Sequence, residues 1–153
     1  MDTWELVDKP PDSIPIANKW VLTKKFNKDS EPVKYKARLV VKGFAQQLGP
    51  DYNETFSSVV CLETIRAILA LVPAKNLNVQ QMDVKGVYLN GYLKELVYMC
   101  QPDGYDDGTG CICHLVKTLY GLKQARCEWN KVLNHKLKAK EFEPTLSDPC
   151  AYI

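Results

Sequence analysis

The sequence lacks the long apolar segments that would place the chain in a membrane or a secretory pathway. No apolar run approaches the roughly 20 residues that a membrane-spanning helix needs. The first residues, Met1 to Glu5, have neither the basic start nor the apolar stretch of a signal peptide. Internal repeats and low-complexity segments are absent as well. We therefore expect a soluble intracellular protein, in the cytoplasm or the nucleus, that makes no membrane contact.

The sequence also lacks the cysteine spacing of a structural zinc site. Cys111, Cys113 and His114 lie together, but such a site needs a second ligand pair, and no pair with CxxC or HxxxH spacing is present. In an intracellular chain the six cysteines are expected to stay reduced. The pattern favours small, partly buried side chains over metal ligands.

The chain has enough apolar material for one compact domain, and its charge is unevenly distributed. Its 153 residues are 46% hydrophobic and 25% charged, with a net charge of +2. Residues 19–43 hold eight basic side chains against Asp29 and Glu31, and residues 117–140 hold seven against Glu128. The middle of the chain is acidic. This distribution suits a polyanion-binding protein with a metal-binding carboxylate site, and it also suits solvated lysine-rich faces.

Apolar periodicity predicts a mixture of strands and helices. Residues 1–18, with three prolines, are expected as an extended lead-in to a domain at 19–153. Strands at 19–26 and 33–44, separated by a polar turn, are expected to form a basic hairpin. The other expected elements are helices at 63–72, ended by Pro73, and 124–140, and strands at 78–84, 96–99 and 151–153. Their irregular order favours an α+β fold over repeated βαβ units.

Five blocks of residues, in a fixed order and spacing, carry a family resemblance. The blocks are Lys36 to Phe44, Tyr52 to Ser57, Gln81 to Gly91, Leu119 to Gln124 with Trp129 and Asn130, and Ser147 to Pro149. Together they closely resemble the reverse transcriptase of Ty1/copia-type retrotransposons, and the resemblance covers the chain from about Trp4 onward. It implies the fingers and the first half of the palm of a polymerase, with an RRM-like antiparallel sheet and packed helices.

The resemblance implies a catalytic centre in the third block. Asp83 matches the first catalytic aspartate, expected at a strand end, where it would bind Mg²⁺ together with the backbone carbonyl of Val84. The same match places Val84 beside the bound nucleotide. Tyr88 matches the aromatic ring that excludes a ribose 2′-hydroxyl, although a core aromatic is the simpler interpretation of a lone tyrosine.

The resemblance also implies residues that contact the incoming nucleotide. Gln124 matches a glutamine that packs near it. Arg38, and with less support Lys24 and Lys36, match fingers residues that neutralise the triphosphate, a task that suits a guanidinium group. For each lysine, a solvated edge strand is an equally good interpretation.

The family's second catalytic block, Tyr-x-Asp-Asp, should follow the Ser147 to Pro149 block, and the 153 residues end before it. Asp106 and Asp107 follow Tyr105, but they precede the fourth block, so their order excludes that role. We therefore expect a truncated, inactive fragment of a Pol polyprotein with uncovered apolar faces. Its parent would be an RNA-directed DNA polymerase that binds an RNA or DNA primer–template, dNTPs and Mg²⁺. The alternative is a noncatalytic basic nucleic-acid-binding module.

The chain departs from the family pattern at several cysteines. Cys61, Cys100, Cys111 and Cys127 stand where relatives often carry arginine or another basic residue. One base change at a CpG turns an arginine codon into a cysteine codon, so we hypothesise a decaying genomic copy. Intact copies in the same genome that share these cysteines would contradict the hypothesis. The lost charges would weaken any interaction with nucleic-acid phosphates.

Overall fold

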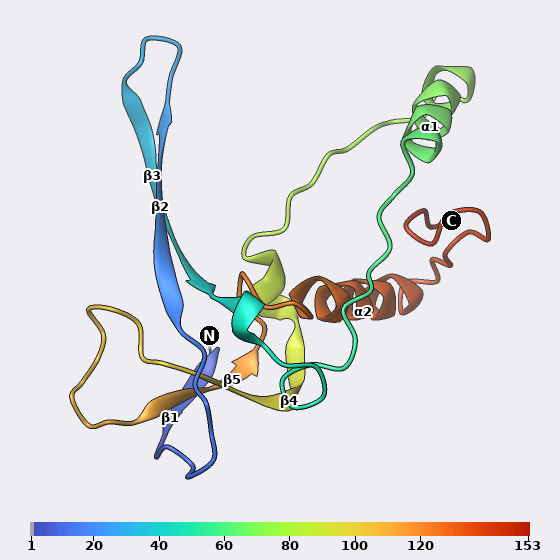
Figure 1. Ribbon diagram of the computed structural model, residues 1–153. Coiled ribbons are helices and arrows are strands. Elements are labelled where there is room, and N and C mark those ends of the chain that lie inside the picture. The colour runs from blue at the N-terminus through green and yellow to red at the C-terminus, as the bar shows by residue number, and fades with distance from the viewer. Residues whose placement is uncertain (1) are drawn as a thin grey trace.

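The computed structural model describes residues 2–153 and combines antiparallel strands with two separate α-helices (Figure 1). In chain order the elements are β1 (Trp4–Val7), β2 (Asn18–Phe26), β3 (Pro32–Val41), the 3-10 helix η1 (Gly43–Ala45), α1 (Leu62–Ala74), the 3-10 helix η2 (Val87–Asn90), β4 (Tyr92–Met99), β5 (Ile112–Lys117) and α2 (Ala125–Lys138). β2 and β3 form one sheet, and β1, β5 and β4 form the other. This composition confirms the predicted α+β class.

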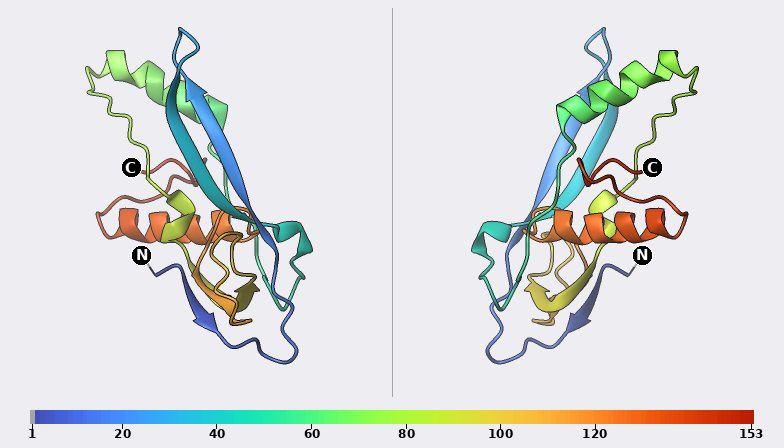
Figure 2. Two further views of the ribbon diagram at one scale, coloured as in Figure 1. Left: turned by 90° about the vertical axis from the view of Figure 1, so that its left-hand side faces the viewer. Right: turned by 90° about the vertical axis from the view of Figure 1, so that its right-hand side faces the viewer.

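The predicted basic hairpin is formed by β2 and β3, which pair antiparallel along their whole length (Figure 2). Leu39 and Val41, near the base of the hairpin, are buried, whereas most residues toward its tip are exposed. β3 ends at Val41 rather than at the expected Phe44, because the chain turns into η1 there. The hairpin is therefore anchored at its base and projects from the body of the molecule.

The turn of the hairpin is closed by one side chain. Asn27 accepts hydrogen bonds at its Oδ1 from the backbone N–H groups of Asp29 and Glu31, at 2.9 and 2.8 Å. Asparagine is favoured in turns because its side chain can satisfy the backbone in this way. The polar turn that the sequence predicts at this place is confirmed.

β5 is the central strand of the three-stranded sheet. Leu115 pairs with Trp4 of β1 on one side and with Val97 of β4 on the other. Residues 1–18, expected as a lead-in, thus contain a strand of this sheet. β5 was not predicted from the sequence, and it contains Cys113 and His114.

The core lies where this sheet meets the base of the hairpin and the start of α2. Its buried residues are Ile16, Leu39, Val41, Val97, Met99, Cys113, Leu115, Leu119, Leu122 and Ala125. The segment that precedes the hairpin is hydrogen-bonded to the end of β4 through Ile16. The Ile16 N–H donates to the Tyr98 carbonyl at 2.8 Å, and the Ile16 carbonyl accepts from the Cys100 N–H at 3.1 Å. α2 packs against η2 and β4.

α1 stands apart from this core (Figure 1). It has no buried residue, and its large apolar side chains are mostly exposed. The helix predicted at 63–72 is confirmed, but it continues to Ala74 with Pro73 in its last turn. Proline removes only its own N–H donor, and the N–H of Lys75 donates to the Leu71 carbonyl at 2.9 Å, which closes the turn beyond it.

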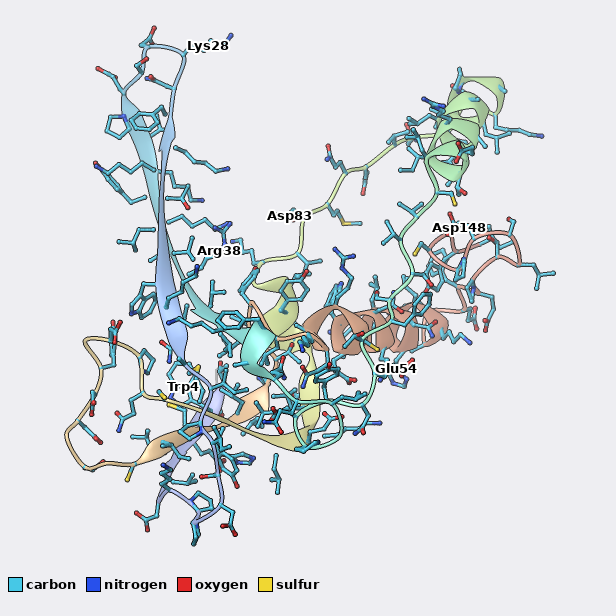
Figure 3. The ribbon with its side chains drawn as sticks, viewed as in Figure 1. Trp4, Lys28, Arg38, Glu54, Asp83 and Asp148 are labelled. Atoms are coloured by element: carbon cyan, nitrogen blue, oxygen red, sulfur yellow. The ribbon has the colours of Figure 1, made fainter. Side chains whose placement is uncertain are left out.

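The prediction of a strand at 78–84 is wrong. Residues 77–84 have no regular structure and are exposed. A strand needs a neighbour for its backbone N–H and C=O groups, and no strand or bridge among residues 2–153 pairs with this segment. Asp83 therefore lies on a coil between α1 and η2, not at the end of a strand (Figure 3).

The helix predicted at 124–140 is confirmed as α2, and the strand start predicted at 151–153 amounts to a single bridge. Pro144 faces Tyr152, and Glu143 and Ile153 exchange backbone hydrogen bonds of 2.8 and 3.0 Å. Across residues 2–153, neither α-helix has the length and apolar character that crossing a membrane requires.

Candidate functional site

Arg38 and Tyr88 reach the same aromatic ring from distant parts of the chain. The guanidinium carbon of Arg38 lies 5.9 Å from the centroid of the Tyr120 ring. The Tyr88 ring meets Tyr120 edge-on, with the centroids 5.0 Å apart. Both arrangements are favourable, because the face of a ring attracts a cation and also the edge of another ring. The structure thus brings together two predicted site residues through a third that was not predicted.

Tyr120 is held in place by the end of β3. The N–H of Val41 donates to the Tyr120 carbonyl at 2.8 Å, and Val40 forms a parallel bridge with Tyr120. The two backbone segments approach each other closely. A Cβ added at Gly121 would lie 2.0 Å from the carbonyl oxygen of Val41, and a Cβ added at Gly43 would lie 2.0 Å from the carbonyl oxygen of Gly121. Gly121 also has φ +93, a conformation that side chains rarely adopt. The two glycines therefore allow the hairpin base to dock on the fourth block.

Tyr88 is half-buried in η2, and its backbone is fixed on both sides. Its carbonyl accepts a hydrogen bond from the hydroxyl of Thr118. Gly86, which precedes η2, has φ +57 and accepts a hydrogen bond from the N–H of Leu89 at 2.8 Å. The Tyr88 side chain packs against the hydrophobic core. Its ring is thus a partly buried aromatic between the core and Tyr120.

Arg38 and Tyr120 also line a cavity of about 230 Å³, together with apolar side chains that include Trp20, Leu39 and Leu89. A larger cavity of about 610 Å³ lies between residues 12–17, the 45–51 loop and β4. None of the predicted site residues lines the larger cavity. Of the predicted site residues, Arg38 alone lines the smaller cavity, which lies at the base of the hairpin.

Lys24 and Lys36 lie on opposite faces of the hairpin. Side chains directly opposite each other in an antiparallel pair share a face, and the faces alternate along each strand. Lys36 pairs with Thr23 and shares the face of Arg38, two residues further along β3. Lys24 pairs with Tyr35, and its ammonium nitrogen lies 5.6 Å from the centroid of that ring. The structure groups Lys36 with Arg38 and separates Lys24 from both.

The face of the hairpin that holds Arg38 is basic. Lys25 and Lys34, directly opposite each other, continue it toward the tip. We call these two residues with Lys36 and Arg38 the basic face. The ion pairs found among residues 2–153 include none of the four. Like charges placed opposite each other are destabilising, so a bound anion would relieve their repulsion.

Gln124 is buried, with only 1% of its surface exposed, and its amide group is engaged within the protein. Its Oε1 accepts from Nε2 of Gln46 at 3.0 Å, and its Nε2 donates to the Asp51 carbonyl at 2.9 Å. Oε1 of Gln46 in turn accepts from the Lys123 N–H at 2.8 Å. The two glutamines thus clamp the 46–51 loop onto the start of α2. A nucleotide could reach the Gln124 amide only if these hydrogen bonds opened.

Asp83 and Val84 lie on the exposed coil that leads from α1 to η2 (Figure 3). Mg²⁺ prefers an octahedral set of oxygen ligands, and proteins usually hold it with one or two carboxylates together with waters or phosphates. No group of three or more histidine, cysteine or acidic side chains that could hold a metal occurs in the part of the chain that the structure describes. One carboxylate and one backbone carbonyl on an exposed coil do not fit the metal site that the resemblance implies.

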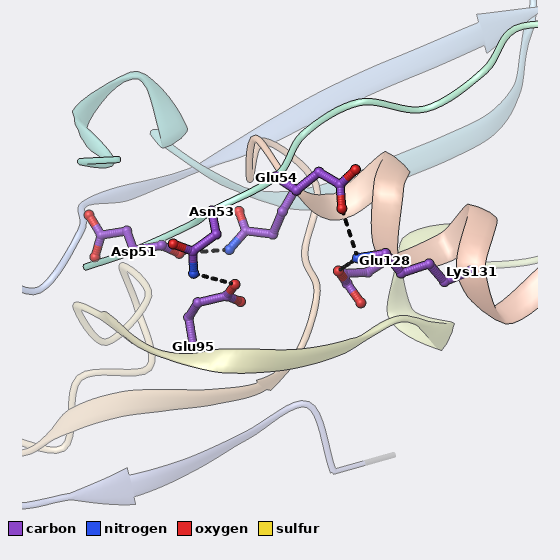
Figure 4. Close-up of polar contacts among 7 residues, drawn as sticks. Asp51, Asn53, Glu54, Glu95, Glu128 and Lys131 are labelled. Atoms are coloured by element: carbon purple, nitrogen blue, oxygen red, sulfur yellow. Dashed lines mark hydrogen bonds and ion pairs between the residues drawn. The ribbon is translucent and has the colours of Figure 1, made fainter. Parts of the chain in front are cut away.

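The second block is tied to α2 and β4 by a small polar network (Figure 4). The ammonium group of Lys131 lies 2.7 Å from Oε1 of Glu128 and 3.6 Å from Oε2 of Glu54. The hydrogen bond with Glu128 raises the pKa of Lys131 above its ordinary value. Nearby, Nδ2 of Asn53 donates to Oε1 of Glu95 at 3.3 Å. These contacts position residues 53 and 54 over the body of the molecule.

Asp148, in the last block, is buried and holds the first turn of α1. Its carboxylate accepts hydrogen bonds from the backbone N–H groups of Cys61 at 2.9 Å and Cys150 at 2.8 Å. These bonds, and a further one with the side chain of Thr64, keep the pKa of Asp148 below its ordinary value. A negative charge at a helix N-terminus also complements the helix dipole. In this structure Asp148 links the end of the chain to α1.

Two residues of the site were missed by the sequence reasoning. Tyr120 lies in a block that carries the family resemblance, so its position was marked, but nothing in its spacing predicts contact with Arg38 or Tyr88. Gln46 belongs to no motif. Its role follows only from its burial and from its hydrogen bonds with Gln124 and Lys123.

The family model described as reverse transcriptase (RNA-dependent DNA polymerase) matches residues 1–153. The chain is 44% identical over 153 residues to the retrovirus-related Pol polyprotein from transposon TNT 1-94 of Nicotiana tabacum. It is 41% identical over 154 residues to the corresponding polyprotein from transposon RE2 of Arabidopsis thaliana. Each alignment covers 99% of this chain but only 12% and 11% of the relatives, respectively.

A more distant relative is the truncated transposon Ty1-A Gag-Pol polyprotein of Saccharomyces cerevisiae, 32% identical over 143 residues, which cover 90% of this chain and 11% of that protein. No solved structure matches the chain. The family match over all 153 residues and the transposon relatives confirm the resemblance carried by the five blocks. The chain therefore belongs to the reverse transcriptase (RNA-dependent DNA polymerase) family, in the group of Ty1/copia-type retrotransposon Pol polyproteins.

Proposed function

We propose that the chain forms the fingers and the first half of the palm of a retrotransposon RNA-directed DNA polymerase. The parent protein would add dNTPs to a primer on an RNA or DNA template inside the cell, with Mg²⁺ as the metal ion. The observation that supports this proposal is the meeting of Arg38 and Tyr88 at Tyr120. Residues from three of the five blocks there supply a cation and two rings at the base of a basic hairpin.

The chemistry of these side chains suits an incoming nucleotide. A guanidinium group can bind two phosphate oxygens at once, so Arg38 is proposed to contact the triphosphate, with Lys36 adding charge on the same face. Tyr88 is held by the core and by Tyr120, which suits a rigid ring that limits the space at the sugar 2′ position. Lys24 is the weaker candidate, since it lies on the other face of the hairpin.

Asp83 is proposed as one catalytic carboxylate of the parent polymerase, with the carbonyl of Val84 as its neighbour in the site. Because the described residues do not fit a divalent-metal site, we assign no catalytic step to them alone. A polypeptide of these 153 residues is therefore expected to bind nucleic acid without extending a primer. Gln124 is proposed to contact the nucleotide only after the 46–51 loop has moved.

The second candidate function is a noncatalytic nucleic-acid-binding module. The observation that favours it is the basic face, which projects from the body and has no acidic partner among the ion pairs of residues 2–153. Binding of phosphates by such a face supplies affinity that depends on salt and not on sequence. Under this interpretation the ring cluster at Tyr120 would be part of the core only.

A fluorescence titration with a labelled primer–template at several salt concentrations tests both candidates. We expect binding that weakens with salt. The logarithm of the binding constant falls linearly with the logarithm of the salt concentration, and each phosphate that a side chain neutralises contributes about 1 to the slope. The double variant Lys36→Ala/Arg38→Ala should therefore reduce this slope by about 2. Lys24→Ala, on the opposite face, is matched to Lys36→Ala alone; the Lys36 variant should change the slope by about 1 and the Lys24 variant by less. Absence of binding, or equal effects of the two variants, would contradict the role of the basic face.

A complementary dNTP distinguishes the polymerase fragment from the module. If Arg38 and Tyr88 form part of a nucleotide site, the next correct dNTP should tighten primer–template binding more than a mismatched one. The Tyr88→Val variant should lose that difference while keeping its affinity for the primer–template alone. Binding that is indifferent to the dNTP supports the module instead.

A further inference from the structure

Asp148 holds two cysteines beside each other. Its Oδ2 accepts the N–H of Cys61 at 2.9 Å, and its Oδ1 accepts the N–H of Cys150 at 2.8 Å. Because the two oxygens of a carboxylate are about 2.2 Å apart, the two nitrogens lie within about 8 Å of each other, which is compatible with the Cα separation of about 4.4–6.8 Å that a disulfide spans. One side chain thus brings together residues from the start of α1 and from the C-terminal turn.

The two thiols differ in their access to solvent. Cys61 is exposed, whereas Cys150 is partly buried. Burial is the main reason that the pKa of the Cys150 thiol is raised, and the charges of Asp148 and of the Cys61 side chain raise it further. Cys113 and Cys127, by contrast, are buried in the body of the molecule.

We propose that Cys61 and Cys150 form a reversible disulfide that locks the first turn of α1 to the C-terminal turn. The oxidant is a small-molecule disulfide such as oxidised glutathione. The Cys61 thiolate attacks it, forms a mixed disulfide and releases one glutathione thiol. The Cys150 thiolate then attacks the Cys61 sulfur and releases the second glutathione. Two protein thiols are oxidised, one glutathione disulfide is reduced, and the two protein protons end on the released thiols.

The bond would close a loop of about 90 residues, and constraining a loop of that length raises stability by restricting the unfolded chain. The loop includes α1, the coil that carries Asp83, and η2 with Tyr88. α1 is otherwise joined to the body by irregular connectors and by the hydrogen bonds of Asp148. Oxidation would therefore fix the position of α1 relative to α2, and reduction would release it.

The test uses the whole 153-residue chain, reduced, desalted and incubated with oxidised glutathione at several protein concentrations. We expect an intact mass lower by about 2 Da, because two thiols lose one hydrogen each on forming a disulfide. Digestion with trypsin without reductant should then give one linked pair, peptides 43–66 and 141–153. The linked fraction should not depend on protein concentration. It should exceed the fraction formed in denaturing urea at least tenfold, or roughly 1.4 kcal/mol.

The variants Cys61→Ser and Cys150→Ser should each abolish the linked pair, and Cys111→Ser, at another partly exposed thiol, should leave it intact. Since a variant could fail to fold, the peptide map of the unchanged chain decides the question by itself. The proposal is overturned if glutathione stays attached to Cys61, if peptide 43–66 links to a second copy of itself, or if linkage in urea equals that in the native state.

Discussion

The side chains of Gln46 and Gln124 meet in a buried hydrogen bond of 3.0 Å, although 78 residues separate them in the sequence. Around this bond, Lys123 donates its N–H to Gln46, and the carbonyl of Asp51 accepts from Gln124. Hydrogen bonds of these polar groups therefore attach the loop after η1 to the start of α2. A polar clamp of this kind is costly to break, because each freed group would stay buried without a partner.

Replacing Gln124 with leucine should lower the free energy of unfolding by about 1–3 kcal/mol, because the amide of Gln46 and the carbonyl of Asp51 would lose their partner. Urea unfolding followed by circular dichroism measures the change. Gln47→Ala, at an exposed side chain in the same loop, is the control and should stay within about 0.5 kcal/mol. Similar losses of unfolding free energy in both variants would show that the hydrogen bonds of Gln124 stabilise the fold no more than an exposed side chain of the same loop does.

Replacing Gly121 with alanine should prevent stable folding, because the new Cβ would meet the carbonyl oxygen of Val41 at 2.0 Å. Gly108→Ala is a matched control, since Gly108 also has positive φ, at +73, but has nothing within 4 Å of the added Cβ. The control should cost only the backbone strain of about 1–2 kcal/mol. Proteolysis and circular dichroism compare the two. Equal stability of the variants would disprove the close approach of β3 and the fourth block.

Replacing Asp148 with asparagine should make the stability of the chain less dependent on pH in acid. Its hydrogen bonds hold the pKa of Asp148 below the ordinary 3.8, so the folded state keeps the carboxylate charged to a lower pH than the unfolded state does. The stability from this group is therefore present above about pH 4 and lost as the pH falls below it.

The measurement is the urea midpoint of wild type and variant between pH 7 and pH 3. The wild type should have the higher midpoint at pH 7, and the difference should shrink below about pH 4. Asp29→Asn, in the exposed hairpin turn, provides the comparison. A difference that stays constant over the whole range would mean that the Asp148 carboxylate contributes by shape and not by charge.

Mg²⁺ should not stabilise the 153-residue chain, because a ligand raises the urea midpoint only if it binds the folded state. Millimolar Mg²⁺ is expected to leave the midpoint unchanged, and Asp83→Asn should alter the free energy of unfolding by less than about 0.5 kcal/mol, as expected for an exposed side chain on a coil. Isothermal calorimetry provides a second readout. Saturable heat with Mg²⁺ that disappears in Asp83→Asn would reveal a metal site that the described residues do not suggest.

The sequence predicted those parts of the fold that depend on residues close to one another in the chain. The hairpin of β2 and β3 has a polar turn closed by Asn27, and α1 and α2 show helical spacing of apolar residues. The segment 78–84 has residues typical of a strand, but it has no neighbour to pair with among residues 2–153, and pairing is not a local property. β1 and β5 were missed for the opposite reason, because they are short and become strands only beside each other and β4.

In the candidate site, too, residues in local motifs could be predicted, whereas contacts between distant segments could not. The blocks of the family resemblance marked Arg38, Tyr88 and the segment of Tyr120, but their contact depends on the docking of β3 against residue 120, which the sequence does not encode locally. The alternation of side chains on β2 and β3 could have separated Lys24 from Lys36 once the register was known. The hydrogen bonds of Gln124 with Gln46 and Asp51 bridge distant segments, and no spacing rule reveals them.

The isolation of α1 has a consequence for how the molecule opens. A helix of 13 residues without buried side chains has little more than its own backbone hydrogen bonds and its tie to Asp148 to keep it formed. Its amide hydrogens should therefore exchange with solvent through local melting, at rates far above those of β4 and β5. The chain would then behave as two cooperative units, with the sheet and α2 persisting after α1 has become a coil.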